Sequence, residues 1–136
     1  MTADWAPICK ALETLHAGWP AGAWSWDARF GCLVAEFSVE LAETIRALVL
    51  EALRDEWTAS NVSTAPRPLR DLLARSGGLE PGQRLFGATE SESIAAFGLW
   101  WPWKNGRTIS LRLGLLNLGA LDEPYPQIRA LFGVAS

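Results

Sequence analysis

Few residues in this chain have the chemistry that catalysis or metal binding requires. His16 is the only histidine, and the two cysteines, Cys9 and Cys32, lie far apart without a CxxC spacing. A serine or cysteine nucleophile needs a positioned base, and a structural zinc ion needs a full set of donors, which these residues do not supply. His16 stands at the end of a predicted helix, where the helix dipole stabilises an imidazolium. The sequence therefore predicts no catalytic histidine, no metal site and no cofactor.

Two carboxylates are the remaining candidates for acid–base chemistry. Asp27 and Glu36 fall on neighbouring predicted strands, and glycosidases work with a pair of carboxyl groups. A turn position for Asp27 and a solvent-facing strand position for Glu36 explain both residues without catalysis. The chain also has neither a GxGxxG nor a GxxxxGK[ST] motif for nucleotide phosphates. We therefore expect the protein not to be an enzyme, and a small carboxylate-dependent enzyme is only the third functional hypothesis.

Length and composition fit one folded domain over residues 1–136. The chain has 136 residues, 49% of them hydrophobic, which is enough for a core without disulfides or metals. A net charge of −3 lacks the basic excess of a nucleic-acid-binding protein. The apolar runs are too short to span a bilayer, and the N-terminus has no signal-peptide pattern. We expect a cytoplasmic protein with reduced cysteines that binds neither nucleic acid nor membranes.

Hydrophobic periodicity predicts the elements that must position any site. Apolar residues recur at helical spacing in four segments, Asp4–His16, Val39–Trp57, Arg67–Arg75 and Tyr125–Phe132. Alternation and turn residues place strands at Ala23–Asp27, Gly31–Ser38, Ile94–Trp103 and Arg107–Leu116. The order α-β-β-α-α-β-β-α predicts an α+β domain in which an antiparallel sheet of about four strands, in two hairpins, packs against helices. This order has a loose topological likeness to secretion-chaperone folds and to PAS or GAF sensor domains, an analogy of fold that assigns no residue.

The hairpin around Asn105-Gly106 decides which tryptophans face outward. With a two-residue loop, Pro102 stands opposite Ile109 at a hydrogen-bonded position, where proline has no N–H to donate. A three-residue loop, Lys104 to Gly106 with Gly106 in the left-handed region, removes this conflict. Its cross-strand pairs all face the core and are Trp101–Ile109, Leu99–Leu111 and Phe97–Leu113. We predict this second register, which turns Trp100 to the opposite face, because a shift of one residue reverses every side chain.

A binding patch on this hairpin is the basis of the first functional hypothesis. Trp100 would lie beside Arg112, with Trp103 and Lys104 at the tip of the hairpin. Trp and Arg dominate the energetics of protein interfaces. Cover by a helix, or by Arg112 stacked on the Trp100 ring, would explain the same pattern without a partner. The hypothesis is a non-catalytic protein-binding protein (an adaptor, a secretion-type chaperone or a toxin-immunity protein) that binds a toxin, a secreted effector or a second copy of itself.

Two other features lead to alternatives. Trp24, Trp26 and Trp101 could line a pocket between the sheet and the helix Val39–Trp57, as in a small-ligand sensor domain. Between Pro66 and Phe86, four basic residues accompany two acidic ones, the basic residues being Arg67, Arg70, Arg75 and Arg84. This run could receive an acidic segment of a partner, but a solvated helix face is the favoured explanation.

Overall fold

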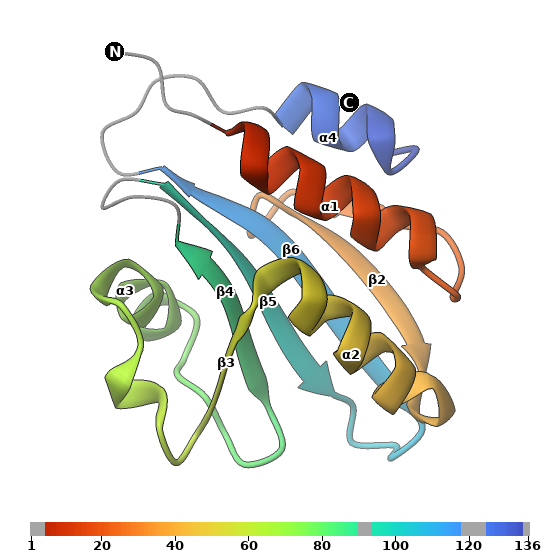
Figure 1. Cartoon of the computed structure of the whole chain (residues 1–136). Coiled ribbons are helices and arrows are strands. Elements are labelled where there is room, and N and C mark those ends of the chain that lie inside the picture. The colour runs from red at the N-terminus through yellow and green to blue at the C-terminus, as the bar shows by residue number, and fades with distance from the viewer. Residues whose placement is uncertain (1–4, 90–93, 118–124, 135–136) are drawn as a thin grey trace.

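The computed structural model describes residues 5–89, 94–117 and 125–134, which form one antiparallel sheet with helices on both of its faces (Figure 1). The helices are α1 (Ala6–Gly18), α2 (Ala42–Leu53), α3 (Arg67–Arg75) and α4 (Tyr125–Leu131), with 3-10 turns at Val39–Leu41 and Val62–Thr64. The strands are β1 (Ser25–Asp27), β2 (Cys32–Ser38), β3 (Asp55–Thr58), β4 (Arg84–Thr89), β5 (Ile94–Pro102) and β6 (Thr108–Asn117). In space the strands follow the order β1-β2-β6-β5-β4-β3.

The predicted α+β class and antiparallel sheet are confirmed, but the sheet has six strands rather than about four. The helix predicted over Val39–Trp57 ends at Leu53, because Arg54 turns the chain with a φ of 66°. Strand β3 begins directly after this turn. Strand β4 buries Leu85 on one face and Phe86 on the other, so it lacks the alternation that identifies a half-buried strand. Hydrophobic periodicity therefore does not identify β3 or β4, and each has a physical reason.

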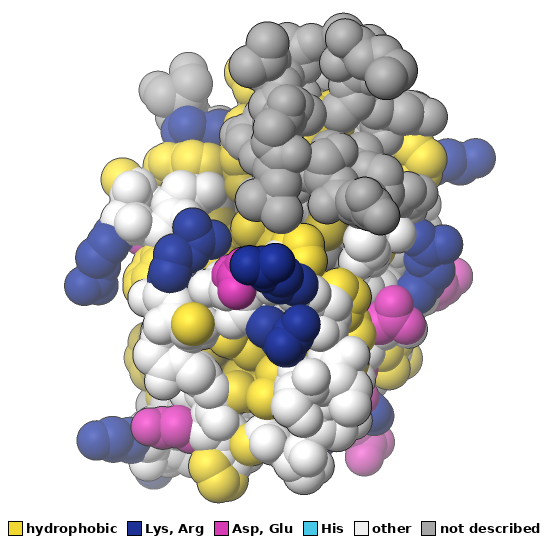
Figure 2. Space-filling model, turned by 90° about the vertical axis from the view of Figure 1, so that its left-hand side faces the viewer, with side chains coloured by type: hydrophobic (Ala, Val, Ile, Leu, Met, Phe, Trp, Pro, Cys, Tyr) yellow, Lys and Arg dark blue, Asp and Glu magenta, His cyan; other side chains and the backbone are white. Residues whose placement is uncertain are grey.

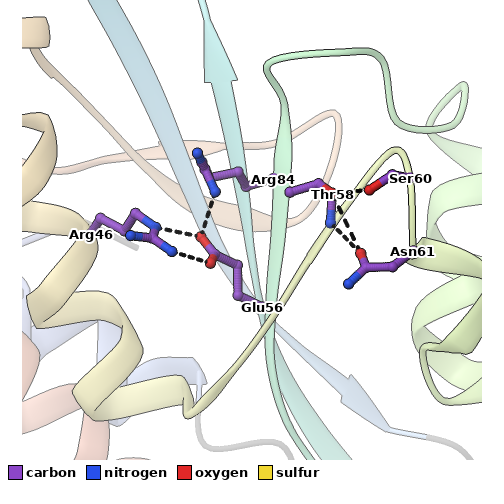
Figure 3. Close-up of polar contacts among 6 residues, drawn as sticks. All are labelled: Arg46, Glu56, Thr58, Ser60, Asn61 and Arg84. Carbon is purple, nitrogen blue, oxygen red and sulfur yellow. Dashed lines mark hydrogen bonds and ion pairs between the residues drawn. The ribbon is translucent and has the colours of Figure 1, made fainter.

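The edge strand β3 is tied to its neighbours by one carboxylate. Glu56 accepts hydrogen bonds from Arg46 of α2, at 2.5 and 2.7 Å, and from Arg84 of β4, at 3.0 Å (Figure 3). The bond from Arg46 is the main reason why the pKa of Glu56 lies below its ordinary value of 4.5. After the strand the chain turns, and the Asn61 side-chain oxygen accepts the amide hydrogen of Thr58 at 2.8 Å (Figure 3).

The strand register divides the side chains of the sheet between two faces, which we call the α1 face and the α3 face. Helices α1, α2 and α4 pack on the α1 face (Figure 1), where the core includes Ile8, Leu12, Leu15, Phe37, Ile45, Val49, Phe86, Trp100 and Leu111. On the α3 face, Leu69 and Leu73 of α3 pack with Leu85, Phe97 and Leu99 of the sheet. The central strands are therefore apolar on both faces.

The predicted register of the β5–β6 hairpin is wrong by one residue. Trp100 pairs with Leu111, and Pro102 pairs with Ile109. The Trp100 side chain is 4% exposed, and its ring centroid lies 5.2 Å from that of Phe37. The prediction that Trp100 faces away from the core is therefore wrong as well.

Two physical features account for this difference. Phe97 is buried beneath α3. This apolar side chain therefore need not point toward the core on the α1 face. The hairpin loop is also longer than either loop considered, because the Trp103 amide donates to the Thr108 carbonyl at 2.8 Å. Pro102 then occupies a non-hydrogen-bonded position, where its missing N–H loses no bond across the hairpin. Gly106 has a φ of 69°, which confirms the predicted left-handed conformation.

Candidate functional site

Helix α3 covers only part of its face of the sheet in the portion of the chain that the structure describes. Leu69 and Leu73 of α3 pack with side chains of β4 and β5. Beside this contact, the face is built by β1, β2, β6 and the end of β5. Polar and aromatic side chains replace aliphatic ones there, and Ser110 is buried on β6 among them. This region contains most of the residues whose chemistry suits recognition.

Arg112 of β6 is the centre of this region. Its Nε donates to Asp27 Oδ2 at 3.3 Å, and Nη1 donates to Ser110 Oγ at 3.1 Å. The guanidinium carbon lies 4.6 Å from the centroid of the Trp101 ring and 5.5 Å from that of Phe30. A cation placed over aromatic rings is attracted by their quadrupoles. We call Asp27, Phe30, Trp101, Ser110 and Arg112 the Arg112 cluster.

Asp27 organises the cluster from the last residue of β1. Its Oδ1 accepts the amide hydrogens of Arg29 at 3.0 Å and of Phe30 at 3.2 Å, which fixes the turn that presents the Phe30 ring. Burial raises the pKa of Asp27, but the hydrogen bonds from the Phe30 amide and from Arg112 outweigh it, so the pKa lies below its ordinary value of 3.8. The ionised carboxylate therefore holds both the turn and the arginine.

Two aromatic rings of this region are exposed, one inside the cluster and one at the hairpin tip. Phe30 is 39% exposed, and Trp103 is 44% exposed. Trp103 follows Trp101 by two residues and pairs with Thr108, so strand alternation directs it to the same face. Lys104 is exposed beside it. We call Phe30, Trp101, Trp103 and Arg112 the aromatic patch.

Of the four residues that were predicted to bind a partner, Trp103, Lys104 and Arg112 lie outside the core of the α1 face. Trp103 and Lys104 are exposed at the hairpin tip, and Arg112 lies on the α3 face. Trp100 lies on the opposite face of the sheet, in the core beneath α2, so its side chain does not join this surface. Sequence reasoning did not identify Phe30, although it stands in a turn, where no strand face is available to bury a phenylalanine.

The three tryptophans predicted to line one pocket lie on two faces of the sheet. Trp24 is 7% exposed and meets Phe132 edge-on, with ring centroids 4.9 Å apart. Trp26 meets Tyr125 of α4 in the same way, at 5.2 Å. Both belong to the α1 face, whereas Trp101 packs on the α3 face. They therefore do not line a common cavity.

Two hollows on the surface have the size of small-molecule sites. One, of about 320 Å³, lies between α1 and the end of α2. The other, of about 390 Å³, lies between the end of α3 and the β1–β2 turn. No tryptophan lines either hollow.

The predicted basic run is divided in the structure. Arg84 is paired with Glu56 on β3, whereas Arg67, Arg70 and Arg75 lie on α3. Figure 2 views the molecule from the side on which α3 lies, and Lys and Arg side chains stand there among exposed hydrophobic groups. Of the arginines on α3, Arg75 lines the hollow that also borders Phe30.

The residues considered for catalysis are not gathered into one site. The His16 ring packs 4.8 Å from that of Phe132, Asp27 is held in an ion pair, and Glu36 is exposed. Burial raises the pKa of the Cys32 thiol to about 12, which is the reverse of an activated nucleophile. Across residues 5–89, 94–117 and 125–134, no three His, Cys, Asp or Glu side chains lie close enough to hold a metal ion.

Comparison with protein-family models, with curated proteins and with solved structures finds no match to this chain. No helix of the described segments is both long enough and apolar enough to cross a membrane. Function is therefore inferred from the chemistry of the surface itself.

Proposed function

We propose that this protein is a non-catalytic binding protein, of the adaptor, secretion-chaperone or toxin-immunity kind, and that it binds another protein through the aromatic patch. The observation that carries the proposal is a guanidinium packed against both the Trp101 and the Phe30 rings, on a sheet face that α3 covers only in part. Trp and Arg are enriched among the residues that contribute most to protein interfaces.

Pre-organisation of the patch supports this proposal. The side chains of Arg112 and Asp27 are 18% and 15% exposed, and they are ion-paired. Phe30 is held by the turn that Asp27 stabilises. Side chains that are already ordered lose little conformational entropy on association, so more of the contact energy remains as affinity.

The exposed area of the patch indicates how much it can contribute. Covering the exposed parts of Phe30 and Trp103 would contribute on the order of 4 kcal/mol, at about 25 cal/mol per Å². Association itself costs about 4–15 kcal/mol, so this contribution alone would not hold two proteins together. A stable interface buries about 800 Å² on each partner. The patch is therefore the centre of a wider contact that extends over Lys104 and the hairpin tip.

A second copy of the chain is the other occupant that would cover the patch. A symmetric dimer would place the same surface of two chains together. Sedimentation of the purified protein separates this case from binding to a different protein, because only the dimer changes with the concentration of the protein alone.

The test compares Trp103→Ala and Phe30→Ala with the control Thr14→Ala. Thr14 is exposed on α1, on the other face of the sheet from the aromatic patch. A partner captured with the wild-type protein is purified, and its affinity for each variant is measured by calorimetry. We expect each patch variant to lose about tenfold in affinity or more, and Thr14→Ala to lose less than about twofold.

Thermal unfolding of each variant provides the folding control. Substitution of exposed side chains should move the Tm by no more than about 3 °C. Wild-type affinity in both patch variants, with an unchanged oligomeric state, would refute the proposal.

A further inference from the structure

The hollow between α3 and the β1–β2 turn, which we call the α3 groove, has features that the aromatic patch does not use. Its volume is about 390 Å³, and its lining includes Arg29, Phe30, Leu72, Arg75, Phe97 and Leu116. Sites for small molecules have volumes of about 300–1,000 Å³. The groove is therefore large enough for a ligand with a chain or ring of several carbon atoms.

The floor of the groove is apolar and continuous with the core. Phe97 is 4% exposed and Leu116 is 9% exposed, and both belong to the cluster that packs under α3. Leu72 of α3 and Phe30 of the β1–β2 turn add apolar surface on the two sides. A ligand with an apolar body would exchange water for hydrocarbon contacts along this floor.

The rim of the groove carries positive charge. Arg29 and Arg75 are both exposed, and neither forms an ion pair within the described part of the chain. The Arg29 guanidinium carbon lies 5.5 Å from the centroid of the Phe30 ring, so it leans over the apolar wall. Among the described residues that line the groove, none is acidic.

The hollow between α1 and α2 has a different character. Its volume is similar, about 320 Å³, but Glu51 lines it together with Lys10. Its apolar lining is formed largely by small side chains, such as Ala88 and Ala96. Because this hollow has both positive and negative side chains and few large apolar ones, it favours no particular class of ligand. Among the described lining residues of these two hollows, only those of the α3 groove combine bulky apolar side chains with charge of one sign.

We propose that the α3 groove binds an amphipathic carboxylate, with its apolar chain on Phe97 and Leu116 and its head group near Arg29 and Arg75. Each buried methylene contributes a factor of up to about four in affinity, and each exposed ion pair a factor of about two to five. The chain thus supplies most of the affinity, and the arginines select the charge. This site needs no protein partner, so it goes beyond the proposed function.

Decanoate is the probe for this proposal. It is titrated, below its micellar concentration, into the full-length protein labelled with ¹⁵N, and amide shifts are followed by NMR. We expect saturable shifts at groove residues such as Leu72, Phe97 and Leu116, with a dissociation constant below about 1 mM. Hexanoate, which has the same head group and four fewer methylenes, should bind at least about tenfold more weakly.

Charge-matched variants separate the arginines of the groove from positive charge in general. The double variant Arg29→Gln/Arg75→Gln should bind decanoate about fivefold more weakly or worse. The control Arg67→Gln removes a charge from the same helix, where the side chain is 84% exposed and pairs with Asp71 outside the groove. Its affinity for decanoate should stay within about twofold of wild type.

Decyltrimethylammonium, which has the same chain length and the opposite charge, should bind at least about fivefold more weakly than decanoate. Equal binding of the two amphiphiles would overturn the proposal, as would shifts confined to residues outside the groove. Absence of saturable binding of decanoate would overturn it too. Because no arm of this experiment involves a protein partner, its failure leaves the aromatic patch to be judged by its own test.

Discussion

Neighbouring tryptophans of this chain have opposite environments because side chains alternate along a strand. The Trp100 ring lies among core aromatic rings, 5.2 Å from Phe37 and 5.8 Å from Phe86. Trp101 packs on the other face, where it meets Arg112. A single residue of register therefore decides which indole stabilises the fold and which is available for recognition.

Alanine substitution at positions 100 and 103 separates these roles. Trp100→Ala should lower the free energy of unfolding by about 3–5 kcal/mol, because it removes a buried ring and leaves a cavity. Trp103→Ala should change it by about 0.5 kcal/mol or less, because its side chain is 44% exposed. Urea unfolding measures both values. Equal losses in the two variants would contradict the observed register.

The carboxylate of Glu56 gives the stability of the protein a dependence on pH. Its pKa in the folded protein lies below 4.5, chiefly because of the hydrogen bond from Arg46. The contribution of Glu56 to the free energy of unfolding is complete well above pH 4.5, where the carboxylate is ionised in both the folded and the unfolded state. As the pH falls further, the unfolded chain takes up the proton first, so the contribution is lost as the pH passes through the folded pKa.

Glu56→Gln should remove this contribution. At pH 7 we expect the free energy of unfolding to fall by about 1–2 kcal/mol, since two charge-assisted contacts are weakened. Below pH 4.5 the wild-type and variant curves should converge. Glu13→Gln, at an exposed position of α1, serves as the control. Its curve of unfolding free energy against pH should run parallel to that of the wild type. If the difference in free energy of unfolding between the wild type and Glu56→Gln stayed constant down to the acid transition, the assigned role of Glu56 would be ruled out.

At the scale of elements, the contact between β5 and β6 depends on a residue without a side chain. Phe97 pairs with Gly114, and a Cβ built at Gly114 would collide with the Phe97 ring. The ring thus lies directly over the glycine backbone of the neighbouring strand. This arrangement fixes the Phe97 ring at the base of the α3 groove.

Gly114→Ala should destabilise the protein by about 1–3 kcal/mol, because the ring must leave its position. Gly22→Ala is the matched control, since nothing lies within 4 Å of a Cβ at that glycine. Its effect should be neutral or slightly stabilising, through a less flexible unfolded chain. Differential scanning calorimetry gives both Tm values, and a Gly114→Ala protein as stable as wild type would contradict the packing described.

Local signals predicted some elements well and others not at all. Helix α3 has the predicted bounds, Arg67–Arg75, because Pro66 before it, Pro68 in its first turn and Gly77 after it mark both ends. Strand β3 was assigned to the preceding helix, since no sequence signal marks the positive φ of Arg54. The predicted register of the β5–β6 hairpin was wrong because of tertiary packing. Burial under α3 makes one face of β5 as apolar as the other. Phe30 was missed because its contact with Arg112 joins distant parts of the chain.

At the scale of the whole molecule, the two faces of the sheet have different tasks. Among the elements that the structure describes, α1, α2 and α4 cover the α1 face and bury the larger core cluster, whereas α3 packs on the other face (Figure 1). The aromatic patch and the α3 groove both lie on the second face, and Phe30 borders both. One side of the sheet therefore supplies stability, and we infer that the other supplies recognition.

The footprint of the captured partner on this protein tests the central claim most directly. Hydrogen–deuterium exchange is measured for the protein alone and in the complex. We predict protection at residues 29–31, 101–104 and 110–112, with exchange in α1 and α2 unchanged. Protection of α1 or α2 while these three segments exchange as in the free protein would contradict the claim that the aromatic patch is the binding surface.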